Sequence, residues 1–190
     1  LLSRGNKVTG VITADAGLEA WARERGIPCT APDGDLVSFA AARPFDYLFS
    51  IVNGHIVPDA VLALARKAGI NFHDGPLPKY AGFNVTSWAL LNGETSHGIT
   101  WHVMEKTLDA GDIIKQQLFA ITPAETSFTL NGKCYEVVIR TFGEMEGELA
   151  SGSDNALAGL QALSNFHREP PVVNIPLLKH PLQIEFERVL

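Results

Sequence analysis

The sequence predicts an α/β fold in which a mostly parallel sheet is flanked by helices. Runs rich in branched and aromatic residues alternate with segments whose apolar residues have helical spacing, and glycine or proline separates them. Such alternation is typical of parallel strands joined by crossover helices. Late in the order two strand-like runs follow each other directly, which favours one antiparallel pair at a sheet edge.

The first half of the chain supplies strand, helix, strand and helix in that order. The β-rich run PFDYLFSIV ends at the Asn53-Gly54 turn, and Pro58 then opens an amphipathic helix that Gly69 stops. An earlier helix of good helix formers ends at Gly26-Ile27-Pro28. The expected elements are strands at 7–13 and 44–52 and helices at 17–25 and 59–68.

The second half continues with a short strand end, a helix, two strands and a long helix. HGITWHVME alternates as a half-buried strand does, and the last helix combines Ser and Thr near its start with a long periodic pattern. The expected strands are 70–73, 97–105 and 112–121, and the expected helices are 86–93 and 126–149.

Composition restricts the class of protein. With 46% hydrophobic and 19% charged residues in 190, the chain is globular, and a net charge of −6 gives no electrostatic footprint for duplex nucleic acid. The longest apolar runs are too short for a membrane span, and no signal peptide opens the sequence. Cys29 and Cys134 form no CxxC pair, so we expect two reduced thiols in a cytoplasmic protein.

The chain divides into a main domain at 1–150 and a C-terminal extension at 151–190. The opening LLSRG is typical of a helix end capped by Gly5, so we expect a fragment of a longer chain whose first strand is missing. The extension holds the helix-like ALAGLQAL and then a proline-rich stretch, which is either a small strand extension or a partner-binding arm.

One stretch, INFHDGPLPKYAG at 70–82, carries the candidate chemistry. Residues two apart on a strand point to the same side, so Asn71 and His73 project together beyond the strand end. An Asn amide can donate to an oxyanion, and a His can move a proton at neutral pH. A carboxylate to orient the His is expected from MEKTLDAGDII, which offers Glu105, Asp109 and Asp112. On spacing alone an Asn-x-His pair is more often structural than catalytic.

Two motifs resemble the formyltransferases that use 10-formyltetrahydrofolate. NFHDGPLPKYAG is similar to the family's N-x-H-P-S-L-L-P-x-Y-x-G, and GITWHVMEKTLDAGDII is similar to G-x-T-x-H-x-M-x-x-x-x-D-x-G-D-I. Asn71 and Asp109 are 38 positions apart (109 − 71), and the resemblance covers about 7 to 150. It implies a Rossmann-like core, with the formyltransferase catalytic domain at 1–150.

The resemblance also implies the site residues. The catalytic trio is Asn71, His73 and Asp109, and formyl passes from N10 of the folate to a primary amine. Asn71 would donate to the oxyanion, and Asp109 would hold the His73 ring. The base role stays open between His73, Asp109 and a bound water. The walls of the pterin slot are formed by His55, Val57, Met104, Glu105, Lys106 and Leu108.

No metal is expected, because His97 and His102 fall on opposite faces of their strand. The family's common Pro-Ser-Leu-Leu is Asp74-Gly75-Pro76-Leu77 here, and this version, with the Trp of GITWH, resembles the formylation domains of nonribosomal peptide synthetases. There the acceptor is an aminoacyl group on a carrier protein. Alternatives are an amino-sugar or methionyl-tRNA formyltransferase, a 10-formyltetrahydrofolate hydrolase, and a non-catalytic folate-binding domain.

Overall fold

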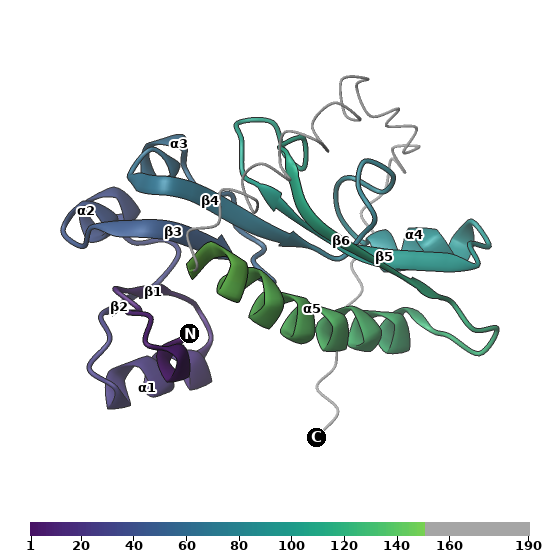
Figure 1. Cartoon of the computed structure of the whole chain (residues 1–190), viewed down its shortest axis with the longest axis horizontal. Coiled ribbons are helices and arrows are strands. Elements are labelled where there is room, and N and C mark those ends of the chain that lie inside the picture. The colour runs from purple at the N-terminus through teal and green to yellow at the C-terminus, as the bar shows by residue number, and fades with distance from the viewer. Residues whose placement is uncertain (151–190) are drawn as a thin grey trace.

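The computed structural model describes residues 1–150. Predictions about the extension at 151–190, including its helix and its proline-rich stretch, lie outside the described residues. Figure 1 shows the order of the elements, in which short helices and strands precede one long helix. They are a 3-10 turn at Leu2–Arg4, β1 (Val11–Ile12), α1 (Ala16–Glu24), β2 (Cys29–Thr30), α2 (Leu36–Ala41), β3 (Phe45–Ser50), α3 (Asp59–Leu62), β4 (Ala65–His73), α4 (Val85–Leu91), β5 (Ser96–Val103), β6 (Ile113–Ala120) and α5 (Ser127–Ala150).

The predicted α/β class is confirmed, and helices flank the sheet. Strands β3, β4, β5 and β6 form a four-stranded sheet in that order, and β1 pairs with β2 in a separate parallel pair. Strands β3 and β4 are parallel, but β4–β5 and β5–β6 are both antiparallel. The prediction of a single antiparallel pair was therefore wrong.

The second antiparallel pair joins β4 and β5. The connection between them spans residues 74–95 and holds α4, a helix of seven residues. The chain enters β5 antiparallel to β4, with His73 opposite Thr100.

The predicted helix at 59–68 was also wrong beyond its first turn. Helix α3 ends at Leu62, and β4 begins at Ala65, where Ala65, Ala68 and Gly69 pair with β3. These residues have helical spacing, but pairing with β3 outweighs the weak propensity of a short segment. The sequence analysis also missed β2 and α2, which lie between the first predicted helix and β3.

Helix α5 covers one face of the four-stranded sheet (Figure 1). The core lies between them and includes Ile70 and Phe72 of β4, Ile99 and Trp101 of β5, and Cys134, Val138, Met145 and Leu149 of α5. The indole Nε1–H of Trp101 donates to Thr141 Oγ1 at 3.0 Å. Because side chains alternate along a strand, Asn71, His73 and Thr100 project from the opposite face.

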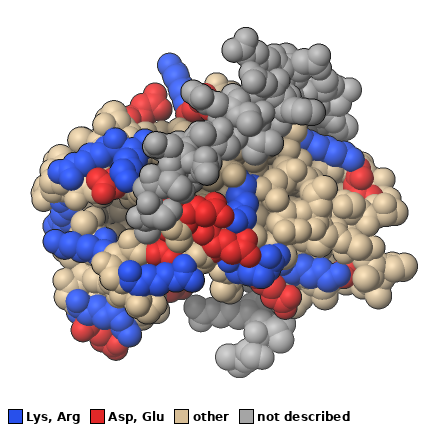
Figure 2. All heavy atoms as spheres, viewed as in Figure 1, with Lys and Arg blue, Asp and Glu red and all other residues tan. Residues whose placement is uncertain are grey.

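Charged side chains of both signs are interspersed on the face of the molecule that Figure 2 shows. Several of them join elements, as Lys115 of β6 does by reaching Glu144 and Glu148 of α5 at 2.9 and 3.2 Å. The N-terminal turn is held in the same way, because Arg4 donates to Glu146 at 2.8 Å. Within residues 1–150, no helix is both long and apolar enough to cross a membrane.

Candidate active site

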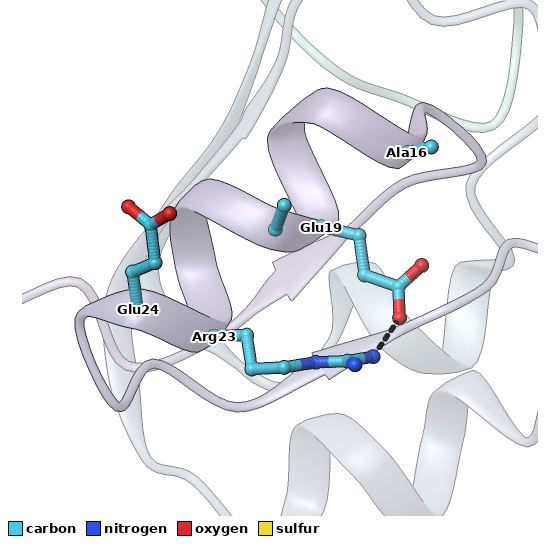
Figure 3. A pocket seen from close by; sticks show the side chains of 5 residues that line it. Ala16, Glu19, Arg23 and Glu24 are labelled. Carbon is cyan, nitrogen blue, oxygen red and sulfur yellow. Dashed lines mark hydrogen bonds and ion pairs between the residues drawn. The ribbon is translucent and has the colours of Figure 1, made fainter.

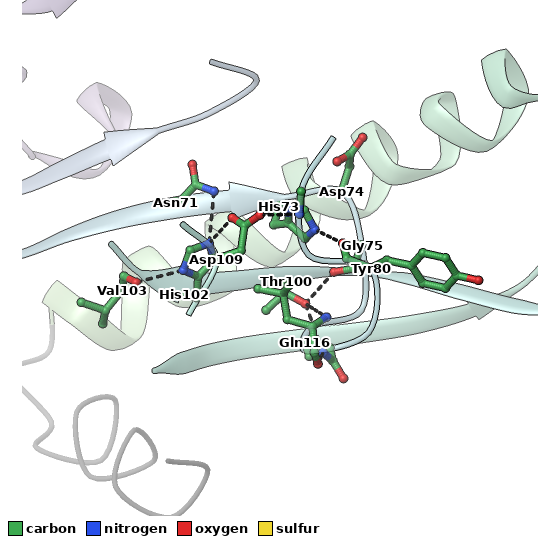
Figure 4. Close-up of polar contacts among 12 residues, drawn as sticks. Asn71, His73, Asp74, Gly75, Tyr80, Thr100, His102, Val103, Asp109 and Gln116 are labelled. Carbon is green, nitrogen blue, oxygen red and sulfur yellow. Dashed lines mark hydrogen bonds and ion pairs between the residues drawn. The ribbon is translucent and has the colours of Figure 1, made fainter. Parts of the chain in front are cut away.

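The structure brings the predicted trio together on the sheet face opposite α5 (Figure 4). Asn71 and His73 come from the end of β4, and Asp109 comes from the loop between β5 and β6. Asp109 Oδ2 lies 3.5 Å from His73 Nδ1, and the side chains of His73 and Asp109 are 5% and 12% exposed. The cluster is therefore largely shielded from solvent, which strengthens its electrostatic interactions.

Asp109 lies close to the other two members of the trio because its loop turns back toward them. The loop does not begin at the same sheet end as the loops after β3 and β4, because β5 is antiparallel and ends beside Ile70 in the middle of β4. The backbone of Asp109 is left-handed, with φ of 54°. The carboxylate is then fixed by Gly82, whose N–H donates to Oδ2 at 2.8 Å.

Gly111 makes this return possible, and we expect Gly111→Ala to lower the rate of the reaction at the candidate site about 100-fold. A Cβ at position 111 would lie 2.0 Å from the carbonyl oxygen of Val103, so the loop carrying Asp109 must move. A shift of about 1 Å in a catalytic group can cost that factor. Steady-state kinetics would measure the loss. Gly132→Ala is the matched control, because a Cβ there meets nothing within 4 Å, and equal rates in the two variants would contradict this reading.

Both ring nitrogens of His73 face hydrogen-bond acceptors. The Tyr80 carbonyl oxygen lies 2.7 Å from Nε2 and can only accept, so Nε2 carries a proton. In the neutral ring the lone pair of Nδ1 would then face the Asp109 carboxylate, whereas a proton on Nδ1 gives an ion pair. Nε2 therefore faces the Tyr80 carbonyl and Nδ1 faces the Asp109 carboxylate.

The sequence analysis missed His102 as a member of this cluster. Its Nδ1–H donates to the Val103 carbonyl at 2.9 Å, and its Nε2 lies 3.1 Å from Asn71 Nδ2 and 3.4 Å from Asp109 Oδ1. In the neutral ring Nε2 accepts from the Asn71 amide, and in the charged ring it donates to Asp109. The signal that could have found it was strand pairing, because His102 lies directly opposite Asn71.

The surroundings of Asp109 lower the pKa of its carboxyl group. Burial disfavours the carboxylate, but the hydrogen bond to His102, the charge of His73 and the N–H of Gly82 together outweigh burial. Asp109 is therefore ionised at neutral pH. It is an acceptor for protons and a counter-charge for both neighbouring imidazoles.

This lowered pKa predicts how stability depends on pH. A carboxyl whose pKa falls on folding stabilises the folded state fully above its ordinary value of about 4 and loses that contribution as pH falls through the folded value. We expect the difference in unfolding free energy between the native protein and Asp109→Asn to shrink as pH falls below about 4. Urea denaturation at several pH values measures this difference, and growth with acidification would contradict the assignment.

The proline-containing loop after His73 is fixed by side chains from β5 and β6. Thr100 Oγ1 accepts from the Leu77 N–H at 3.1 Å and donates to the Gly75 carbonyl at 2.7 Å. Gln116 Nε2 donates to the Leu77 carbonyl at 2.8 Å. A Cβ at Gly75 would lie 2.9 Å from His73 Nε2, so glycine allows the loop to approach the His73 ring closely.

The residues predicted for the pterin slot lie in two loops, one after β3 and one after β5. In the loop after β3, Asn53 Nδ2 donates to the His55 carbonyl at 2.8 Å and Asn53 Oδ1 accepts from the His55 N–H at 3.0 Å. His55 is exposed and Val57 is half-buried. In the loop after β5, the Met104 N–H donates to the Gly69 carbonyl at 2.8 Å, and Glu105, Lys106 and Leu108 are exposed.

The remaining reactive groups are placed as follows. Among residues 1–150, no group of three His, Cys, Asp or Glu side chains is arranged to hold a metal ion. Both cysteines are free thiols, and burial raises the pKa of Cys134 to about 12.

A surface hollow on α1 is lined by Ala16, Glu19, Ala20, Arg23 and Glu24 (Figure 3). Its Glu19–Arg23 ion pair at 2.5 Å is exposed, and the hollow contains none of the predicted site residues.

Comparison with known proteins agrees with the motifs. A family model for formyl transferase matches residues 29–142, which include the whole trio. A phosphoribosylglycinamide formyltransferase from Bacillus halodurans is similar in structure, with a TM-score of 0.71 and 22% identity over 80% of this chain and 84% of that chain.

Two further solved structures share the fold. An enzyme of the same description from Anaplasma phagocytophilum has a TM-score of 0.62 and 23% identity over 69% of this chain and 68% of that chain. A 4-N formyltransferase from Francisella tularensis has a TM-score of 0.62 and 21% identity over 75% of this chain and 58% of that chain.

Proposed function

Because this chain belongs to the formyl transferase family and is an N-formyltransferase, we propose that it formylates the primary amine of an aminoacyl group on a carrier protein. The formyl donor of the family is 10-formyltetrahydrofolate. The catalytic part of this proposal rests on one observation. Asp109 contacts His73 and His102 beside Asn71, and all four residues lie inside the region that the family model matches.

Asn71 stabilises the oxyanion that forms when the amine attacks the formyl carbon. Its amide has two N–H groups, and one of them is sufficient for the contact with His102 at 3.1 Å. The second N–H is free to donate to the former carbonyl oxygen. Such a donor stabilises the transition state by about 3–4 kcal/mol.

His73 supplies positive charge next to the same oxygen. Its ring is buried, and the Tyr80 carbonyl and Asp109 fix its orientation, so little reorganisation is needed during the reaction. The ionised Asp109 lies 3.5 Å from Nδ1 and is the counter-charge for the protonated ring in this arrangement.

The overall reaction moves one proton from the amine to N10 of the folate. The new amide C–N bond forms, the bond from the formyl carbon to N10 breaks, and N10 leaves with its electron pair. Asp109 accepts the proton that the amine loses, and the imidazolium of His73 donates its Nδ1 proton to N10 while its Nε2–H stays on the Tyr80 carbonyl. Transfer of a proton from Asp109 to Nδ1 of His73 then restores both groups, and their distance of 3.5 Å allows it with a small movement.

The folate binds between the loop after β3 and the loop after β5. His55 and Val57 line one wall of the pterin slot, and Met104, Glu105, Lys106 and Leu108 line the other. Two observations support this placement. Exposed apolar side chains occur in both loops, with Ile56 and Leu108 being 71% and 54% exposed, and the second loop continues directly into Asp109.

The carrier-bound acceptor is supported by the variant HDGPLPKYAG, in which Asp74 and Gly75 replace the more common Pro-Ser. Trp101, which accompanies this variant, is fully buried and donates to Thr141, so it marks the subgroup without contacting an acceptor. Gly75 lies directly against His73, and this difference from the common motif is therefore next to the reacting atoms.

The test is turnover of 10-formyltetrahydrofolate with a valyl-loaded carrier protein, followed by mass analysis of the carrier. We expect a gain of one formyl group, and none on the matched control carrier whose valyl amine is acetylated. If an amino sugar or methionyl-tRNA is formylated in preference to the carrier, that amine is the acceptor instead of the carrier-bound aminoacyl group. Tetrahydrofolate release without any amine would indicate a hydrolase, and folate binding without turnover would indicate a non-catalytic domain.

A further inference from the structure

We infer that Glu94, acting through Tyr80, is a positioning residue for His73. This inference rests on the proposed role of His73 in formyl transfer. Glu94 is outside the trio and lies in the short connection between α4 and β5. It touches no proposed reacting atom, but a continuous chain of contacts links its carboxylate to the imidazole of His73.

The first link joins Glu94 to the Tyr80 side chain. The Tyr80 hydroxyl donates to Glu94 Oε1 at 2.8 Å and accepts from Asn92 Nδ2 at 3.0 Å. Hydrogen bonds from Lys79 and Tyr80 lower the pKa of Glu94, and burial raises the pKa of Tyr80. At neutral pH an ionised acceptor therefore meets a protonated donor, which is a strong type of hydrogen bond.

The second link joins the Tyr80 backbone to His73. The Tyr80 carbonyl oxygen accepts from His73 Nε2 at 2.7 Å (Figure 4). Tyr80 has a left-handed backbone with φ of 67°, an uncommon conformation for a large side chain. Such a residue keeps its conformation only when its surroundings hold it, and the hydroxyl contacts provide an anchor.

His97 supports the same arrangement from β5. Its ring packs edge-on against the Tyr80 ring at 6.3 Å between centroids. Its Nε2 lies 2.8 Å from the carbonyl oxygen of Asp74, the residue that follows His73, so Nε2–H donates to it. Tyr80 therefore holds the ring of His73, and His97 holds the backbone of the residue that follows His73.

The consequence concerns the direction of the imidazole. While the Tyr80 carbonyl holds Nε2–H, Nδ1 points to Asp109 at 3.5 Å. If the Tyr80 hydroxyl loses its anchor, the strained backbone at Tyr80 can relax and its carbonyl can turn away. His73 then loses one of its two fixed partners, and its orientation toward Asp109 is no longer unique.

The experiment compares Tyr80→Phe and Glu94→Ala with the native protein. We expect kcat to fall about tenfold in both, with the KM for 10-formyltetrahydrofolate changed less than about twofold, because the defect concerns orientation and not folate binding. Glu94→Gln keeps a side-chain acceptor for the hydroxyl and should recover most of kcat. Lys79→Gln removes the ion pair to Glu94 at 2.5 Å and the contact of the ammonium with the face of the Tyr80 ring at 5.3 Å, but it keeps the bond from the Tyr80 hydroxyl to Glu94 and should keep the native rate.

A second readout does not depend on activity. NMR detects the Nε2–H proton of His73, assigned by its loss in His73→Ala, and its exchange with water should be at least about tenfold faster in Tyr80→Phe and Glu94→Ala than in Lys79→Gln. Native kcat together with native exchange in both variants would overturn the inference. If the native protein formylates no amine, the proposed function fails, while the exchange rates still decide the role of Glu94.

Discussion

Replacing Asn71 or His73 with alanine is expected to abolish formyl transfer and to leave the fold intact. Loss of one oxyanion donor costs about 10²–10³ in kcat, and loss of a positioned proton donor costs a similar factor. Neither side chain is part of the apolar core, which lies on the other face of the sheet between β4, β5 and α5. Steady-state turnover of 10-formyltetrahydrofolate with the working amine measures the effect.

The control for both variants is a measurement that shows whether the fold is intact. His73→Ala leaves the Tyr80 carbonyl without its donor at 2.7 Å, which costs about 1–3 kcal/mol of unfolding free energy but should not change the circular dichroism spectrum at 25 °C. A variant that keeps near-native turnover would remove that residue from the site. A variant that is unfolded would be replaced by Asn71→Ser or His73→Gln, for which we expect the same loss.

Asp109→Asn is expected to keep folate binding and to lose turnover about 10³-fold. The substituted side chain has almost the same shape, and its amide oxygen can still accept from the Gly82 N–H, which lies 2.8 Å from Oδ2 in the native protein. The negative charge next to His73 Nδ1, and with it the proposed acceptor of the amine proton, is lost, however.

Two measurements separate binding from chemistry in this variant. Calorimetry with a folate that cannot transfer its formyl group should give native affinity, and rapid-quench kinetics should show that the chemical step has slowed. Native turnover in Asp109→Asn would contradict the role of the carboxylate. A large loss of folate affinity would instead place Asp109 in the binding of the folate.

The pairing of Asn71 with His73 could be predicted because its signal is local in the sequence, where the two residues are two apart at a strand end. The choice of Asp109 over Glu105 and Asp112 came from the resemblance of its segment to a family motif. The position of Asp109 next to His73 could not be predicted in the same way. It depends on the antiparallel direction of β5 and on the approach of Gly111 to Val103, which are properties of the folded chain.

The residues that were missed all depend on contacts across the fold. His102 joins the site because it pairs with Asn71 across two strands, and strand register cannot be read from one strand alone. The first residues of β4 have helical spacing, yet they form a strand because β3 offers a partner. The role proposed for Glu94 likewise depends on a contact with Tyr80, 14 positions earlier in the chain.

The most direct test of the central claim is the absorbance change that accompanies tetrahydrofolate release from 10-formyltetrahydrofolate, recorded with and without the aminoacyl-loaded carrier protein. We predict turnover only with the loaded carrier, and loss of that turnover in His73→Ala. No turnover with the carrier or with any other amine, in a protein whose fold is intact, would contradict the proposed formyl transfer at Asn71, His73 and Asp109.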